Sequence, residues 1–170
     1  MKSQRADGKP FFAFINAMEP HLPYTPPDDV AKQFLPADAT AEEVAEARSF
    51  DFPKTLPFLL GTQSLTARQR TILTALYDAE IATLDASIGR MLDTLEKEGV
   101  LDETLVIVCG DHGENLGDHG LVEHRFSLHR SIRRVPLVVR LPGRFDGGRT
   151  VANVVSLEDV LPTVLEACGV

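Results

Sequence analysis

Residues 104–120 of the chain read TLVIVCGDHGENLGDHG, an unbroken apolar run that leads into a loop of glycines, carboxylates and histidines. A short apolar run without alternation is typical of a strand buried on both faces, as in a parallel sheet. Gly110 and Gly113 flank Asp111 and His112, so the backbone can turn sharply where the strand ends. Ligands of open α/β sheets bind beyond the carboxyl ends of strands. This stretch therefore predicts both a buried strand and the place of a site.

Three further segments have the same unalternated apolar character: 11–17, 136–141 and, more briefly, 151–155. Two helices are expected, one from the capping residue Thr66 to about Glu98 and a last one over 157–167 after Ser156. Strands that alternate with helices predict an α/β fold, with a mostly parallel sheet flanked by helices.

The segment between the first strand and the long helix is expected to be irregular. Residues 20–27 contain four prolines, which predict a loop. Residues 28–65 are polar and broken, which indicates a surface excursion with one short helix around residues 41–49.

Composition limits the possible partners. The chain has 170 residues, 44% of them apolar, and a net charge of -8. The acidic balance argues against nucleic acid, because phosphate binding needs basic patches. No apolar run approaches the ~20 residues of a membrane span, and the first ten residues lack the apolar core of a signal peptide. We therefore expect a soluble domain, of unknown compartment, that binds neither nucleic acid nor membrane.

Histidines gather after the second strand. Four of the five lie between residues 112 and 129, and His21 follows the strand predicted over 11–17. A carboxylate beside an imidazole suits a divalent cation, so Asp111 and His112 are candidate ligands.

Each of these residues also has a structural interpretation. Asp111 and His112 could form an Asx-turn with a solvated imidazole, and His21 could be an ordinary loop residue. The nearby acidic residues are expected to form either a solvated edge or an acidic layer that contacts the metal ligands from outside: Glu114, Asp118 and Glu123. Cys109 is expected to behave as a small buried apolar residue.

The run over 104–120 resembles the signature of the sulfatase family in the alkaline phosphatase superfamily, a strand followed by S-D-H-G-E-x-L-G-[DE]-H-G. Gly110 stands where the family has serine. Four other segments resemble family motifs in the same order: 10–12 with 21–24, 77–85, 134–140 and 156–163. The resemblance covers nearly the whole chain and implies a partial alkaline-phosphatase-like α/β domain.

The resemblance also implies roles for four side chains. Asp111 and His112 match two metal ligands, His21 matches the histidine that contacts the sulfate or its leaving-group oxygen, and His124 matches a sulfate-binding Lys or His. The implied cofactor is a divalent metal ion, with Ca²⁺ expected first and Mn²⁺, Mg²⁺ or Zn²⁺ as alternatives. The implied substrate is a small-molecule or carbohydrate sulfate ester.

One family motif does not occur in the chain. The family nucleophile is a Cys or Ser in C/S-x-P-x-R, the cysteine being matured to formylglycine, and neither Cys109 nor Cys168 begins such a motif. We therefore expect residues 1–170 to be the later part of the catalytic domain, without its nucleophile segment and C-terminal subdomain, and to be inactive alone. A phosphonate or phosphate ester hydrolase and a non-catalytic remnant are the alternatives to a sulfuric ester hydrolase.

Overall fold

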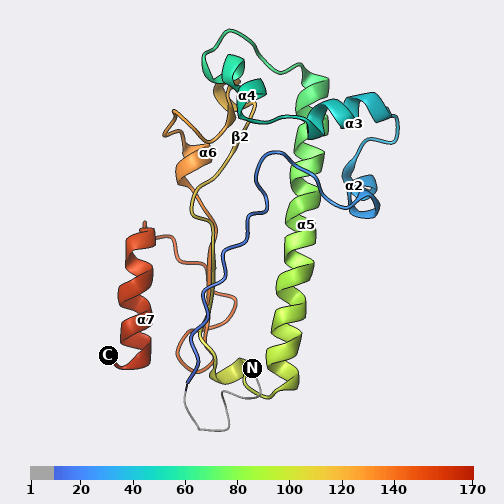
Figure 1. The fold of residues 1–170 in the computed structure, drawn as a ribbon. Helices are drawn as coiled ribbons and strands as arrows, with labels where there is room; N and C mark the ends of the chain where they lie inside the picture. Colours follow the sequence, from blue (N-terminus) through green and yellow to red (C-terminus); the bar gives the residue numbers. More distant parts are fainter. Residues whose placement is uncertain (1–9) are drawn as a thin grey trace.

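The computed structural model describes residues 10–170, which form a long helix with strands and short helices around it (Figure 1). The helices are α2 (Asp28–Phe34), α3 (Ala41–Arg48), α4 (Phe52–Leu59), α5 (Ala67–Lys97), α6 (Arg130–Arg133) and α7 (Val160–Cys168). The strands are β1 (Val106–Cys109), β2 (Asn115–Leu116), β3 (Val122–Glu123) and β4 (Leu137–Arg140). The expected lack of a signal peptide concerns residues 1–9, which lie outside the described residues.

The long helix predicted after Thr66 is confirmed as α5. The Thr66 hydroxyl accepts the backbone N–H of Gln69 at 3.1 Å, and the Gln69 side chain accepts the Thr66 N–H at 3.0 Å. Gly99, just past the C-terminal end, has a φ of +67°, which favours glycine. No helix in residues 10–170 is both long and apolar enough to cross a membrane.

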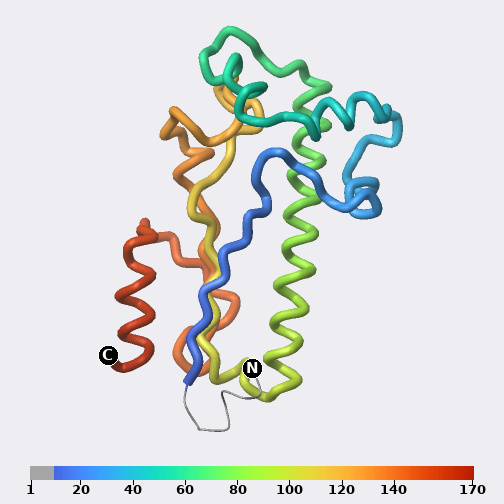
Figure 2. The backbone as a smooth tube through the Cα atoms, in the orientation of Figure 1, coloured from blue at the N-terminus to red at the C-terminus, as the bar shows by residue number. Residues whose placement is uncertain are grey.

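The last predicted helix is also confirmed. The Ser156 hydroxyl accepts the backbone N–H of Glu158, and a 3₁₀ turn over Leu157–Asp159 leads directly into α7. In Figure 2 α7 lies on the far side of the strands from α5.

The hydrophobic core surrounds the N-terminal half of α5, where α2 and α3 pack. Its buried residues are Leu22, Tyr24, Ala31, Ala47, Phe50, Phe58, Ile72, Leu73, Leu76, Ala79 and Val122. The expected short helix is α3, but residues 28–65 also form α2 and α4. The prediction of a surface excursion is wrong for this segment, because four of its apolar side chains are buried in the core: Ala31, Ala47, Phe50 and Phe58.

Both strand pairs are antiparallel. β1 pairs with β4, from Val106 opposite Arg140 to Cys109 opposite Leu137, and β2 pairs with β3. The strands predicted around 104–109 and 136–141 are thus present, whereas the parallel sheet is not confirmed.

The other two predicted strands do not form. Residues 11–17 run in an extended course (Figure 2), but they belong to no sheet, and Phe12 and Phe14 are both 82% exposed. Residues 151–155 are likewise exposed and irregular. An apolar run becomes a buried strand only where neighbours hydrogen-bond its edges and cover its faces, and residues 10–170 provide no such neighbours here.

Leu76 is fully buried at the centre of the core. Leu76→Ala is expected to lower the free energy of unfolding by about 2–5 kcal/mol, because it removes apolar burial and leaves a cavity. Urea denaturation of the chain measures this. The matched variant Leu161→Ala, on α7 where the side chain is 64% exposed, should change it by less than about 0.5 kcal/mol. Equal losses would contradict a core centred on α5.

Candidate functional site

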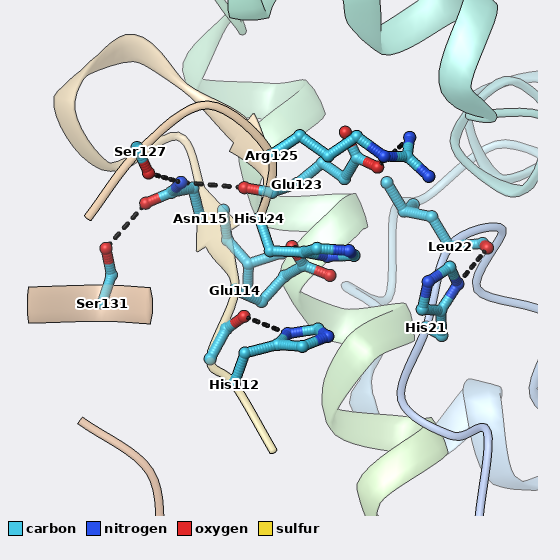
Figure 3. A network of polar contacts seen from close by, with 12 residues as sticks. His21, Leu22, His112, Glu114, Asn115, Glu123, His124, Arg125, Ser127 and Ser131 are labelled. Carbon is cyan, nitrogen blue, oxygen red and sulfur yellow. Dashed lines mark hydrogen bonds and ion pairs between the residues drawn. The ribbon is translucent and has the colours of Figure 1, made fainter. Parts of the chain in front are cut away.

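Three histidines from two distant segments meet between α5 and the loop after β1 (Figure 3). The ring centroids of His112 and His124 lie 4.0 Å apart and are stacked, and those of His21 and His124 lie 5.3 Å apart at 60°. The convergence of His112 and His124 that the sequence indicated is therefore found, and His21 joins them.

Asp111 and His112 follow the end of β1 and face each other. Oδ1 of Asp111 lies 3.8 Å from Nε2 of His112 and also accepts the His112 backbone N–H at 2.9 Å. Nδ1 of His112 lies 2.9 Å from the Gly113 carbonyl. Because a carbonyl only accepts, Nδ1 carries the hydrogen and the neutral ring keeps a lone pair on Nε2. The pair thus offers one carboxylate oxygen and one imidazole nitrogen to a cation.

Glu114 links the loop after β1 to the proline-rich loop. Its Oε1 lies 3.2 Å from Nδ1 of His124, and its Oε2 accepts the Tyr24 hydroxyl at 3.1 Å. The Glu114 side chain is only 4% exposed. A solvated edge is wrong at Glu114, because Tyr24 covers it, and at Glu123, which is buried beside Arg125. The alternative expectation, a carboxylate that contacts the site residues from outside, agrees with the position of Glu114 against His124. Asp118 alone of the three is partly exposed, near Arg70.

Burial is the largest cause of the pKa shifts of Glu114 and His124. It raises the pKa of Glu114 to about 7, and the Glu123 carboxylate adds to the increase. It also lowers the pKa of His124 to about 4, with His112, His21 and Arg125 adding to the decrease. At neutral pH the His124 imidazole is therefore uncharged in the unliganded site. A bound anion would favour its protonated form and oppose this decrease.

Glu80 on α5 holds the loop that carries His21. Its carboxylate accepts the backbone N–H of Thr25 at 2.7 Å and that of His21 at 3.3 Å. Burial raises the pKa of Glu80, and the two N–H donors oppose that shift. Sequence reasoning missed this role. The available signal was a carboxylate four residues from both Leu76 and Leu84, on the apolar stripe of α5.

Buried contacts of Asn115 and Gly113 fix the loop between β1 and β3. The fully buried Asn115 donates to the Glu123 carbonyl at 2.8 Å and accepts from the Ser131 hydroxyl at 2.6 Å (Figure 3). A Cβ on Gly113 would lie 1.9 Å from the Ser131 carbonyl oxygen, so only glycine fits against α6. These contacts fix the backbone segment that carries His112 and His124.

The other candidates from the sequence lie apart from this cluster. His119 and His129 stack on each other at 3.8 Å and are exposed. Cys109 is exposed, not buried, because no described segment covers its side of β1.

A family model described as Sulfatase matches residues 1–170. The chain belongs to the sulfatase family. Members of this family, within the alkaline phosphatase-like superfamily, generally use a divalent metal ion and formylglycine. In the present chain Asp111 and His112 place a carboxylate oxygen beside an imidazole nitrogen. No cluster of three or more potential His, Cys, Asp or Glu ligands occurs within residues 10–170. The donor types fit a cation, but they make up only part of a coordination sphere.

This sulfatase chain is 37% identical over 94 residues to an N-acetylglucosamine-6-O-sulfatase of Bacteroides thetaiotaomicron. The matched region covers 55% of the chain and 17% of that relative. It is 30% identical to a multifunctional alkaline phosphatase superfamily protein of Trinickia caryophylli, over 96% of the chain and 35% of the relative. It is 29% identical to an arylsulfatase of Clostridium perfringens, with the same coverage. The chain thus spans about a sixth to a third of the length of these curated relatives.

A solved structure shares the fold. It is described as a complex with the substrate D-glucosamine-2-N,6-O-disulfate and matches with a TM-score of 0.59 at 29% identity. The match covers 76% of this chain and 24% of that one. A partial α/β domain of the sulfatase type is therefore supported by coordinates as well as by sequence.

Proposed function

We propose that the chain carries part of the active site of a metal-dependent sulfuric ester hydrolase. In this proposal residues 1–170 are the later part of the catalytic domain, and a separate segment of the complete protein brings the nucleophile. The isolated chain is inactive because none of its residues lies in a C/S-x-P-x-R motif.

One observation carries the proposal: the ring centroid of His124 lies 4.0 Å from that of His112 and 5.3 Å from that of His21, although His21 is about 90 residues away in the sequence. Asp111 adds a carboxylate to the same loop. Imidazoles grouped beside a carboxylate, in a chain of the sulfatase family, suit an anionic ester held next to a cation.

Each side chain is assigned a role from the atoms that it has available for a ligand. Asp111 and Nε2 of His112 would hold a divalent ion, Ca²⁺ first and otherwise Mn²⁺, Mg²⁺ or Zn²⁺, which stabilises negative charge on the ester oxygens. His124 binds a sulfate oxygen. His21 donates a proton to the departing alcohol. Nδ1 of His21 already donates to the Leu22 carbonyl at 2.7 Å, so only Nε2 is left for this transfer, and it carries a proton only in the imidazolium form.

A phosphonate or phosphate ester hydrolase is the second candidate, favoured by the multifunctional relative that covers 96% of the chain. Rates of the purified complete protein on matched aryl sulfate, phosphate and phosphonate esters distinguish the two. We expect the highest kcat/KM with a sulfate ester, from a small molecule or a carbohydrate. A higher value with phosphate or phosphonate would replace the first proposal by the second, and no hydrolysis of any ester would support a non-catalytic remnant.

The isolated chain is expected to bind Ca²⁺ weakly. Two ligands leave an ion mostly hydrated, whereas Ca²⁺ prefers ~6–8 oxygens. Isothermal titration of the 170-residue chain should show no saturation below millimolar Ca²⁺, with Asp111→Ala as the control. Tight binding that Asp111→Ala abolishes would mean that these residues form a complete site and would contradict the proposed division of ligands.

A further inference from the structure

None of the roles above uses the buried carboxyl of Glu114. Both of its oxygens are committed to protein side chains, Oε1 to His124 at 3.2 Å and Oε2 to the Tyr24 hydroxyl at 3.1 Å. Tyr24 is fully buried, so it cannot move away without disturbing the core. A carboxyl held at both oxygens has a fixed orientation and is not available to a ligand.

The partner of this carboxyl is a ring with one nitrogen left. Nδ1 of His124 faces Glu114, and Nε2 has no hydrogen-bonding partner among residues 10–170. The ring of His112 stacks on His124 at 4.0 Å and limits its tilt. Because Glu114 holds one edge of the imidazole, it also fixes the direction in which Nε2 points.

We propose that Glu114 is a positioning residue that acts through His124. By holding Nδ1 it directs Nε2 toward the anionic group of the ester, and Tyr24 keeps Glu114 in place. This inference rests on the proposed function. A purely structural role is the competing explanation, since a buried hydrogen-bonded carboxyl also stabilises a fold.

A double-mutant cycle in the complete protein separates the two explanations. Glu114→Ala is expected to lower kcat/KM about 10–100-fold, the usual cost of losing a partner that orients a functional histidine. Glu114→Gln should recover most of that loss, because its amide keeps one hydrogen-bonding group beside Nδ1 and another beside the Tyr24 hydroxyl. In a His124→Ala background, Glu114→Ala should cost less than about threefold.

Equal costs of Glu114→Ala in the two backgrounds would overturn the proposal, and so would equal losses from Glu114→Ala and Glu114→Gln. Either result would leave Glu114 with a packing role only.

A second measurement does not depend on activity. In the 170-residue chain, Glu114→Ala is expected to shift the Nδ1 resonance of His124 in ¹⁵N spectra and to leave the exposed His129 unchanged. An unshifted His124 would overturn the positioning role. Lack of ester hydrolysis by the wild-type protein would refute the proposed function, and the spectra would still decide whether Glu114 orients His124.

Discussion

Asp111→Ala in the complete protein is expected to lower kcat/KM by about 10³-fold or more. The variant would lose one of the two proposed metal ligands, and metal and charge stabilisation at such sites supplies several kcal/mol. The fold should be unaffected, because the side chain is 86% exposed and its hydrogen-bonding partner is the neighbouring His112 N–H. The measurements are kcat/KM, the bound-metal content by elemental analysis, and the thermal midpoint.

Asp102→Ala is the matched control. Asp102 is 80% exposed and pairs with Arg140 at 2.5 Å, at the opposite end of β1 from Asp111. Exposed ion pairs contribute about 0–1 kcal/mol, so this variant should keep both its activity and its metal. Equal activity and equal metal content in the two variants would remove Asp111 from the metal site.

The parts of the fold that the sequence predicted well depend on local signals. The capping box at Thr66 and the left-handed Gly99 define α5 within a few residues, because both signals act inside one helix turn. Sheet pairing is not local. The apolar run 11–17 indicates burial on two faces, but the sequence does not state which segments cover them, and residues 10–170 leave Phe12 and Phe14 exposed.

The sequence predicts the candidate site residues whose side chains could bind a metal or an anion. Residue type and family resemblance predicted Asp111, His112, His124 and His21 as site residues, and the structure brings the three histidines together. Glu114 was expected either in a solvated edge or in contact with the ligands, whereas the supporting roles of Tyr24 and Glu80 were missed. The contact of Tyr24 with Glu114 joins positions 90 residues apart, and no spacing rule relates them. Such contacts arise only when the proline-rich loop packs on α5.

His21→Ala and His124→Ala are each expected to lower kcat/KM by about 10²–10³-fold in the complete protein, the usual cost of one charge-stabilising contact. The two losses should differ in their dependence on the leaving group. Proton donation matters most for poor alcohols, so His21→Ala should hurt alkyl sulfates more than activated phenyl sulfates. His124 is proposed to bind the sulfate itself, so the loss in His124→Ala should be equal across the series. The measurement is log(kcat/KM) against the leaving-group pKa for both variants.

The thermal midpoint must be measured together with these rates, because the His124 side chain also packs against its neighbours. The His124 side chain is 16% exposed and is packed between His112 and Glu114, so its truncation leaves Oε1 of Glu114 without its partner. His124→Gln, which keeps a side-chain donor, should melt closer to wild type than His124→Ala and still lose activity. A leaving-group-independent loss in His21→Ala would leave His21 a binding contact only. Variants that melt early but keep full activity per folded molecule would show that both histidines serve the fold instead of the reaction.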